Sequence, residues 1–318
     1  KGTANALEMA IDFLNEDLLV MNGDVIINSK ELRRLVTKKG NVMSIIEVKD
    51  TTDLGVVTIN NDKIDQIYEK LNHPPGKMAN AGIYRFTPDI KKYLSATSLS
   101  PRGEYEISDS IRMMIEDGLE VSYIELDKWF NLSYPWSLLD ANEELLSNSK
   151  RVMNGNIEPG VEVKGEVCIG KSTVIRSGSY IIGPVMIGDN CDIGPNCYIR
   201  PSTSIGNNCH IGAAVELKNS IIMNGCKIPH HNYMGDSIIG ENCNLGAGTK
   251  IANLRLDKAN IKINGKDTGR RKLGAIIGDN VKTGINSSIN VGTLIGNNTV
   301  IGPDTLVNGV IAPNTKIY

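Results

Sequence analysis

The chain has 318 residues, of which 34 are basic and 36 acidic, and a formal net charge of −2. This length can form two hydrophobic cores, and the nearly balanced charge argues against a nucleic-acid partner. The sequence contains no run of eighteen apolar residues and no secretory leader, so we expect no membrane association and a cytoplasmic location.

The first half alternates helical and strand patterns. Helices are predicted up to about Phe13 and over Ser29–Lys38, Pro88–Leu94, Ile107–Glu116 and Trp136–Leu146. Strands are predicted at Leu18–Met21 (a buried strand), Val42–Val48, Gly55–Asn60, Gly82–Phe86 and Val121–Leu126. This alternation is typical of an α/β layer with a mainly parallel sheet. Ligands of such sheets bind at the carboxyl ends of strands, where Asp24 lies.

The second half follows a different period. From Ile157 to Leu217 every sixth residue is aliphatic, and the residue four positions after each of the first ten is small. A period of six fits neither an amphipathic helix nor an alternating strand. It is typical of a parallel β-helix, in which three short strands form one coil of roughly eighteen residues and equivalent positions stack. The aliphatic side chain would point inward, with the small one filling the remaining interior.

Most of the cysteines follow this period. Five of the six occupy the small position of a repeat: Cys191, Cys197, Cys209, Cys226 and Cys243. We expect them to be buried as small apolar side chains. The sequence has no C-x-x-C pair, which argues against a zinc site.

The repeat slips and is then interrupted. It shifts by one residue after Leu217 and again before Ile239, ends at Ile251, and resumes at Ile277. Residues 252–272 between them are rich in charge, which predicts a loop projecting from one face, either a binding loop or a plain solvated one. We therefore predict two domains, residues 1–148 and 149–318, with the loop inserted in the second. The helix at Trp136–Leu146 is expected to pack on the first.

Several segments of the first half, taken together, resemble the sugar-1-phosphate nucleotidylyltransferases. They are Gly2-Thr3-Ala4, Asn22-Gly23-Asp24, Leu54-Gly55-Val56-Val57, Tyr68-Glu69-Lys70, Asn80-Ala81-Gly82-Ile83-Tyr84, Gly103-Glu104-Tyr105 and Trp129-Phe130-Asn131. The resemblance implies that Asp24 and Asn131 hold Mg²⁺ against the phosphates, although Asp24 could also be a simple turn residue. It places Gly2 and Thr3 near the base and sugar of the nucleotide, and it implies hydrogen bonds to the sugar from Gly55, Glu69 and Asn80.

One part of that family's pattern is missing from the sequence. The glycine-rich loop that cradles the triphosphate should precede Gly2 by several tens of residues, and no such loop is found. We therefore expect a shortened, incomplete nucleotidyltransferase domain of Rossmann-like α/β type, with impaired nucleotidyl transfer.

The repeats of the second half resemble the hexapeptide-repeat family, whose coils wind left-handed. Two segments, Pro229–Asp236 and Asn242–Thr249, further resemble the acetyltransferase domain of bifunctional N-acetylglucosamine-1-phosphate uridyltransferases. This resemblance implies that His230 is the catalytic base and that Asn244 is the family's catalytic asparagine. It places Arg200 and Lys218 at the sugar phosphate, Tyr233 at the sugar and Asn253 in the same pocket. Ala247 would lie at acetyl-CoA. A surface turn remains the alternative for His230.

Together these resemblances predict an enzyme with two activities. It would acetylate glucosamine-1-phosphate with acetyl-CoA and transfer a nucleotidyl group from UTP or dTTP to the resulting sugar-1-phosphate. Backbone N–H groups of residues 246–248 could stabilise the oxyanion. A homotrimer is expected, in which the loop at 252–272 is too charged to pack on its own coil and reaches a neighbouring subunit.

Three other readings compete with this one. The first is a thymidylyl- or uridylyltransferase acting on glucose-1-phosphate, whose β-helix only trimerises it. The second, a γ-type carbonic anhydrase, needs three converging histidines, and His210, His230 and His231 lack that spacing. The third is a regulatory subunit that has lost its chemistry.

Overall fold

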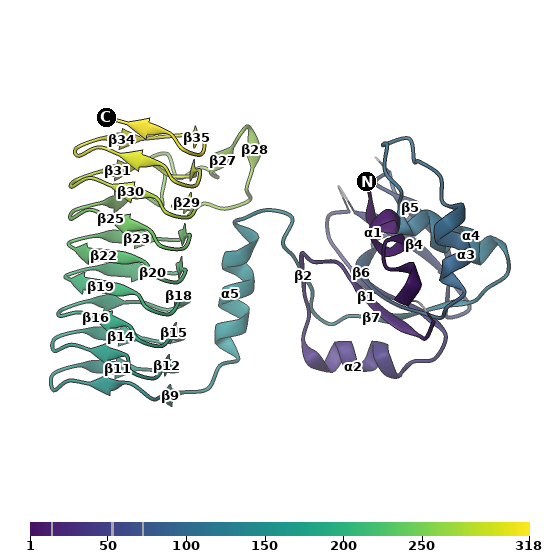
Figure 1. Cartoon of the computed structure of the whole chain (residues 1–318), viewed down its shortest axis with the longest axis horizontal. Coiled ribbons are helices and arrows are strands. Elements are labelled where there is room, and N and C mark those ends of the chain that lie inside the picture. Colours follow the sequence, from purple (N-terminus) through teal and green to yellow (C-terminus); the bar gives the residue numbers. More distant parts are fainter. Residues whose placement is uncertain (14, 52–53, 72) are drawn as a thin grey trace. The chain divides into compact units, whose positions relative to one another are not determined.

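The structure is a computed structural model that describes all residues except 14, 52, 53 and 72. The chain forms two compact units, Lys1–Ser133 and Tyr134–Tyr318 (Figure 1). None of the described helices is both long and apolar enough to span a membrane.

The first unit is built on a six-stranded sheet with the order β1-β6-β3-β7-β5-β4. Its strands are β1 (Leu18–Met21), β3 (Asn41–Glu47), β4 (Gly55–Asn60), β5 (Lys63–Glu69), β6 (Met78–Phe86) and β7 (Val121–Glu125). A separate two-stranded ribbon pairs β2 (Val25–Ile26) with β8 (Phe130–Asn131). The helices are α1 (Thr3–Glu8), the short 3₁₀ helix η1 (Ile11–Phe13), α2 (Ser29–Thr37), α3 (Ile90–Ala96) and α4 (Ile107–Glu116).

The expectation of a mainly parallel sheet is wrong. Among the described strands of this sheet, only β3 and β7 pair in parallel, and the other pairings are antiparallel. A tight hairpin is one cause: β4 and β5 are joined by Asn61 and Asp62, both with positive φ (49° and 60°). Two successive left-handed residues form the turn that matches the twist of a hairpin. Strand β5, missed in the sequence analysis, is the second arm of this hairpin.

Strand β1 was expected to be buried, and it is only half-buried. It pairs with β6 at one edge of the sheet, so Leu19 and Met21 are 43% and 48% exposed. The apolar core lies on both faces of the sheet. Met43 and Ile45 of β3 pack with α3 and α4 on one face, and Val42 packs with Leu35 of α2 on the other. Successive residues of a strand point to opposite faces, so one strand contributes to both layers.

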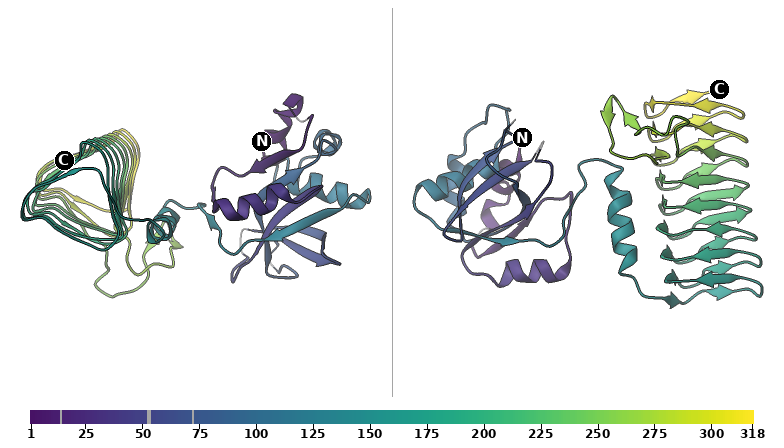
Figure 2. Two further views of the ribbon diagram at one scale, coloured as in Figure 1. Left: turned by 90° about the horizontal axis from the view of Figure 1, so that it is seen from below. Right: turned by 180° about the vertical axis from the view of Figure 1, so that it is seen from behind.

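The second unit is a parallel β-helix with the triangular cross-section seen in Figure 2. The described strands form three parallel sheets, of nine, eight and nine strands. The first sheet contains β10 (Asn156–Ile157), β13 (Val174–Ile175), β16 (Asp192–Ile193), β19 (His210–Ala213), β22 (Lys227–His230), β25 (Asn244–Leu245), β30 (Lys282–Thr283), β33 (Val300–Ile301) and β36 (Lys316–Ile317).

The other two sheets complete each coil. The second contains β11 (Glu162–Lys164), β14 (Tyr180–Ile182), β17 (Tyr198–Ile199), β20 (Glu216–Lys218), β23 (Tyr233–Gly235), β26 (Lys250–Ile251), β31 (Ser288–Ile289) and β34 (Leu306–Val307). The third contains β9 (Val152–Met153), β12 (Val167–Ile169), β15 (Val185–Ile187), β18 (Thr203–Ile205), β21 (Ile221–Ile222), β24 (Ile238–Ile239), β29 (Ala275–Ile277), β32 (Thr293–Ile295) and β35 (Val310–Ile311).

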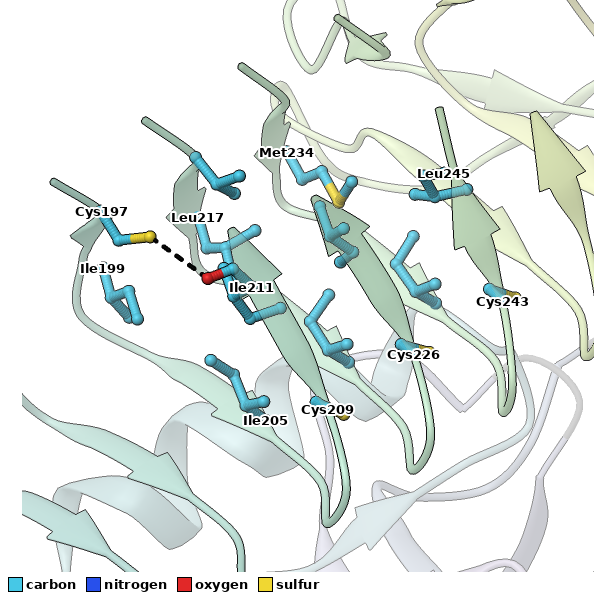
Figure 3. Packing of buried hydrophobic residues seen from close by; sticks show 14 of the residues in the cluster. Cys197, Ile199, Ile205, Cys209, Ile211, Leu217, Cys226, Met234, Cys243 and Leu245 are labelled. Carbon is cyan, nitrogen blue, oxygen red and sulfur yellow. Dashed lines mark hydrogen bonds between the residues drawn. The ribbon is translucent and has the colours of Figure 1, made fainter. Parts of the chain in front are cut away.

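The predicted repeat and its slips are confirmed by the strand register. Ile175 pairs with Ile193, 18 residues later, whereas Ile205 pairs with Ile222, 17 residues later. The aliphatic column and the five cysteines fill the interior. Figure 3 shows Cys197, Cys209, Cys226 and Cys243 among their aliphatic neighbours. Each of these thiols donates to a backbone carbonyl of the next coil, as Cys197 Sγ does to Gly212 O at 2.9 Å. A buried thiol therefore replaces the hydroxyl that Thr173 offers in an earlier coil.

Helix α5 (Ser137–Ser147) packs on the β-helix, not on the first domain as expected (Figure 1). Its Asn142 donates to Ser202 O (2.9 Å) and its side-chain oxygen accepts from Ser204 Oγ (2.5 Å). Trp136, just before the helix, and Leu139 are buried against Ile238. The apolar face of the helix is thus covered by the outer face of the third sheet.

The inserted loop also packs on its own unit, contrary to the expectation that its charge would prevent this. Within it β27 (Lys262–Ile263) and β28 (Lys266–Asp267) form a short hairpin. Ile261 and Ile263 are buried in the same cluster as Trp136. The coils continue beneath the loop, because β24 pairs directly with β29 across it.

Candidate functional site

A cavity of about 240 Å³ in the first unit collects most of the residues predicted there. Its lining includes six of the seven: Thr3, Asp24, Gly55, Glu69, Asn80 and Asn131. Gly2 is outside the lining and lies against Tyr105, where a Cβ would come within 2.3 Å of the backbone oxygen. Only glycine fits that close approach, at φ +105°. Segments far apart in the sequence therefore meet at one polar cavity.

Asp24 is a turn residue directly before β2, and Asn131 lies on the paired strand β8. Val25 pairs with Asn131, and Leu132 N donates to Asp24 O at 2.8 Å. Asn131 Oδ1 accepts from Ser133 Oγ at 2.7 Å, which orients the amide. The described residues contain no group of three or more His, Cys, Asp or Glu side chains that could hold a metal. One carboxylate and one amide oxygen nevertheless fit Mg²⁺, which usually takes few protein ligands and completes its shell with phosphates and water.

The lining of the cavity also includes Gly55, Glu69 and Asn80. Gly55 pairs with Glu69, and a Cβ at Gly55 would come within 2.9 Å of the Glu69 carboxylate. Burial raises the pKa of Glu69 above its usual range, and the nearby Glu106 carboxylate raises it further. Asn80 donates to the Tyr84 hydroxyl at 2.7 Å, so its amide is held in one orientation. This part of the lining offers hydrogen-bonding groups of fixed direction, as recognition of sugar hydroxyls needs.

Two further lining residues were not singled out in the sequence analysis. Arg102 binds Glu106 through two hydrogen bonds, Nε–Oε1 at 2.9 Å and Nη2–Oε2 at 2.8 Å. Glu106 is itself buried. Both residues lie just before α4, with Glu106 directly preceding its first residue. The paired charges therefore form part of the cavity lining. Arg102 directly precedes the Gly103-Glu104-Tyr105 segment, so the only sequence signal was its position beside that motif.

In the second unit, Arg200 and Lys218 each lie beside a carboxylate. Arg200 Nη1 is 2.9 Å from Glu216 Oε1, and its guanidinium lies over the Tyr198 ring at 5.4 Å. The hydrogen bond to Glu216 raises the pKa of Arg200. Lys218 Nζ is 3.8 Å from Asp236 Oδ2. Both cations belong to the face of the second sheet, at the ends of β17 and β20.

Tyr233 and Asn253 meet on the same face. A Cβ at Gly235 would come within 2.5 Å of Asn253 Nδ2 and 2.8 Å of the Tyr233 hydroxyl, so the two side-chain tips share one small space. Asn253 also donates to Asp236 Oδ2 at 2.5 Å. Burial raises the pKa of Tyr233, so this phenol remains protonated near neutral pH. Arg200, Lys218, Tyr233 and Asn253 thus form one polar group, joined through Glu216 and Asp236.

His230, Asn244 and Ala247 belong to the first sheet or to the turn that follows it, whereas Tyr233 belongs to the second sheet. His230 is exposed at the end of β22, at the corner between the first and second sheets, and its carbonyl accepts from Gly248 N at 3.0 Å. Asn244 is exposed on β25 in the first sheet, between Lys227 and Lys282 of the adjacent strands. Ala247 follows it in the turn. His231 has φ +50°, and Lys250 donates to its carbonyl.

Comparison with known proteins agrees with both halves. A nucleotidyl transferase family model matches residues 1–148, one described as the GMPPB C-terminal domain matches residues 181–284, and a hexapeptide repeat of succinyl-transferase matches residues 274–303. A bifunctional sugar-1-phosphate nucleotidylyltransferase/acetyltransferase of Sulfurisphaera tokodaii is 43% identical over 97% of this chain and 78% of the relative. The chain belongs to this family of bifunctional enzymes.

Further relatives support the bifunctional nucleotidylyltransferase/acetyltransferase family. The bifunctional protein GlmU of Methanocaldococcus jannaschii is 40% identical over the whole chain and 78% of that relative. A UTP–glucose-1-phosphate uridylyltransferase of Haloferax volcanii is 31% identical over 46% of this chain and 63% of its own length. The chain is therefore a nucleotidyltransferase unit followed by a hexapeptide-repeat acetyltransferase unit, as the resemblances predicted.

Proposed function

We propose that this chain acetylates glucosamine-1-phosphate with acetyl-CoA and then converts the N-acetylated sugar phosphate to its UDP-sugar. The observation that carries the first step is the polar group of Arg200, Lys218, Tyr233 and Asn253 on one face of the β-helix. Two cations suit a phosphate dianion, and a phenol and an amide suit a sugar ring. The family membership supports the pairing of the two activities.

In the acetyl-transfer step, the amine must be neutral to attack the thioester carbonyl. A histidine imidazole is a suitable general base, and His230 is exposed at a coil corner where it can meet a bound amine. The new C–N bond forms as the carbonyl oxygen takes up negative charge, and backbone N–H groups of residues 246–248 are candidate donors to it. The C–S bond then breaks, and the proton that the amine gave up to the base is transferred to the CoA thiolate as it leaves.

The nucleotidyl-transfer step belongs to the cavity of the first unit. An oxygen of the sugar phosphate would attack the α-phosphorus of UTP and release pyrophosphate. Asp24 and Asn131 would hold Mg²⁺, which neutralises phosphate charge and aligns the reacting groups when bound. Gly55, Glu69 and Asn80 would bind the sugar, with Thr3 nearer the nucleotide and Gly2 shaping the backbone beside it.

A homotrimer is part of this proposal, because one chain spreads its acetyl-transfer residues over two sheets. Asn244 and Ala247 belong to the first sheet and its turn, whereas Tyr233 belongs to the second. In a three-fold assembly the first sheet of one subunit can face the second sheet of its neighbour, which would bring the residues together. A monomer by light scattering at micromolar concentration, with acetyl transfer retained, would contradict this.

The deciding experiment measures CoA release from acetyl-CoA with glucosamine-1-phosphate, and pyrophosphate release from UTP with N-acetylglucosamine-1-phosphate. We expect CoA release from this chain, and an impaired rate of pyrophosphate release, because its sequence lacks the glycine-rich loop that cradles the triphosphate. Glucose-1-phosphate, which has no amine, is the matched control in the CoA assay and should give none. Pyrophosphate release without any CoA release would instead support a nucleotidylyltransferase with a non-catalytic β-helix.

A further inference from the structure

Asp236 is a buried carboxylate at a corner of the β-helix, where the preceding coil carries an asparagine. Asp236 is 4% exposed and has φ +51°, and Asn219 occupies the corresponding corner with φ +44°. Elsewhere in the β-helix stacked asparagines pass a hydrogen bond from one coil to the next, as Asn280 does to Asn298 at 3.2 Å. An asparagine amide can donate and accept in such a ladder, whereas a carboxylate can only accept. A carboxylate at position 236 therefore needs hydrogen-bond donors on both of its oxygens, unlike the asparagines of the ladder.

Those partners come from both sides of Asp236. Asn219 Nδ2 donates to Oδ1 at 2.7 Å, Asn253 Nδ2 donates to Oδ2 at 2.5 Å, and Lys218 Nζ is 3.8 Å from Oδ2. Because the carboxylate only accepts, Asn253 must turn its NH₂ group toward Asp236. Its carbonyl oxygen then points away from Asp236. Asp236 thus sets the orientation of the Asn253 amide at the proposed sugar site.

We infer that Asp236 is a positioning residue for acetyl transfer, an inference that rests on the function proposed above. Its carboxylate fixes the amide orientation of Asn253 beside Tyr233. An asparagine at 236 would present an NH₂ group to one of the two amides that now donate to it. Asn253 would then lose its fixed orientation, although the backbone would be undisturbed, since asparagine tolerates this left-handed φ.

The test is a double-mutant cycle with Asp236→Asn, Asn253→Ala and the double variant. A hydrogen bond to a charged group predicts a loss of roughly 10- to 100-fold in kcat/KM for glucosamine-1-phosphate in Asp236→Asn. If Asp236 acts through Asn253, the double variant should be no slower than Asn253→Ala alone. Asn219→Ala is the matched control. It removes the other amide donor, leaves Asn253 in place, and should cost less than about threefold.

Thermal unfolding of the same proteins separates positioning from a structural role. Asp236→Asn should unfold within a few degrees of wild type, because the substitution changes one atom type and suits the corner. If the loss in kcat/KM of the double variant equals the product of the losses in Asp236→Asn and Asn253→Ala, the two residues act independently and the inference is overturned. Equal losses in Asp236→Asn and Asn219→Ala that follow the unfolding temperature would also overturn it. Absence of CoA release by the wild-type protein would instead overturn the proposed function, and this inference with it.

Discussion

Gly235 lies directly beneath the tips of Tyr233 and Asn253, so Gly235→Ala tests the proposed acetyl-transfer site with a single methyl group. The new Cβ would be 2.5 Å from Asn253 Nδ2 and 2.8 Å from the Tyr233 hydroxyl. Ordinary contacts between such atoms are about 3.5 Å or longer, so the two tips must retreat by roughly 1 Å. A displacement of about 1 Å at reacting groups can cost roughly 10²-fold in rate. We therefore expect acetyl transfer to fall by about 100-fold.

The same substitution should leave the fold nearly unchanged. The φ of Gly235 lies outside the left-handed region, and the three heavy atoms nearest the new Cβ are all at the ends of side chains. Replacing glycine by alanine at a compatible position stabilises a protein by about 0.4–1 kcal/mol, which offsets the cost of moving the two tips. Gly76→Ala, whose Cβ would meet nothing within 4 Å, is a control for the substitution itself.

The assay is the initial rate of CoA release with glucosamine-1-phosphate, alongside the unfolding temperature of each variant. Pyrophosphate release by the same Gly235→Ala protein is an internal control, because that reaction is assigned to the other unit. Acetyl transfer within threefold of wild type in a folded Gly235→Ala protein would refute the placement of the sugar beside Tyr233 and Asn253. A large loss of both activities, with a lowered unfolding temperature, would show that the methyl group disrupts the coil.

Three further predictions concern single side chains. His230→Ala should lower CoA release by about 10² or more, the scale of a lost general base, while His231→Ala should cost less than about tenfold; the reverse order would assign the base to His231. Because the pKa of Glu69 is raised in the folded state, wild type loses stability as pH rises above the unfolded value of 4.5. The free energy of unfolding of Glu69→Gln, measured in urea, should therefore increase relative to that of wild type as the pH rises above 4.5. A difference in unfolding free energy that does not change with pH would contradict this prediction. Asp24→Asn should raise the Mg²⁺ concentration for half-maximal pyrophosphate release by about tenfold or more, and an unchanged Mg²⁺ titration would remove Asp24 from the metal site.

The β-helix could be predicted because its signal is local and repeated. Each coil places its aliphatic residue by the same short turn, so a slip such as that before Ile222 is visible in the sequence and returns as a 17-residue register. The sheet of the first unit was harder to predict, since strand direction depends on partners far apart in the chain. The one local clue missed there was Asn61-Asp62, a two-residue loop whose left-handed turn makes β5 antiparallel to β4.

The site residues show the same limit. The resemblance to the acetyltransferase family predicted that Tyr233 and Asn253 belong to one pocket, and the structure places their side chains next to each other. The role of Asp236 could not be inferred from the sequence, because its donors come from the preceding coil and from the start of the insertion. The packing of Ile261 on Trp136 was likewise hidden, since the charged residues of the insertion dominate its composition.

The contacts at the start and middle of α5 imply that this segment is matched in length to the coils beneath it. Ser204, Ile221 and Ile238 stack in successive coils, so two strand spacings, about 9.6 Å, separate the first from the last. Asn142 of the helix binds Ser204, and Trp136, just before the helix, packs in the same cluster as Ile238. Six residues separate those two, which is about 9 Å at 1.5 Å per residue. A protein of this design that lost one of the coil steps between Ser204 and Ile238 would keep both contacts only by also losing about three residues between Trp136 and Asn142, so the number of coils beneath this segment and its length should change together.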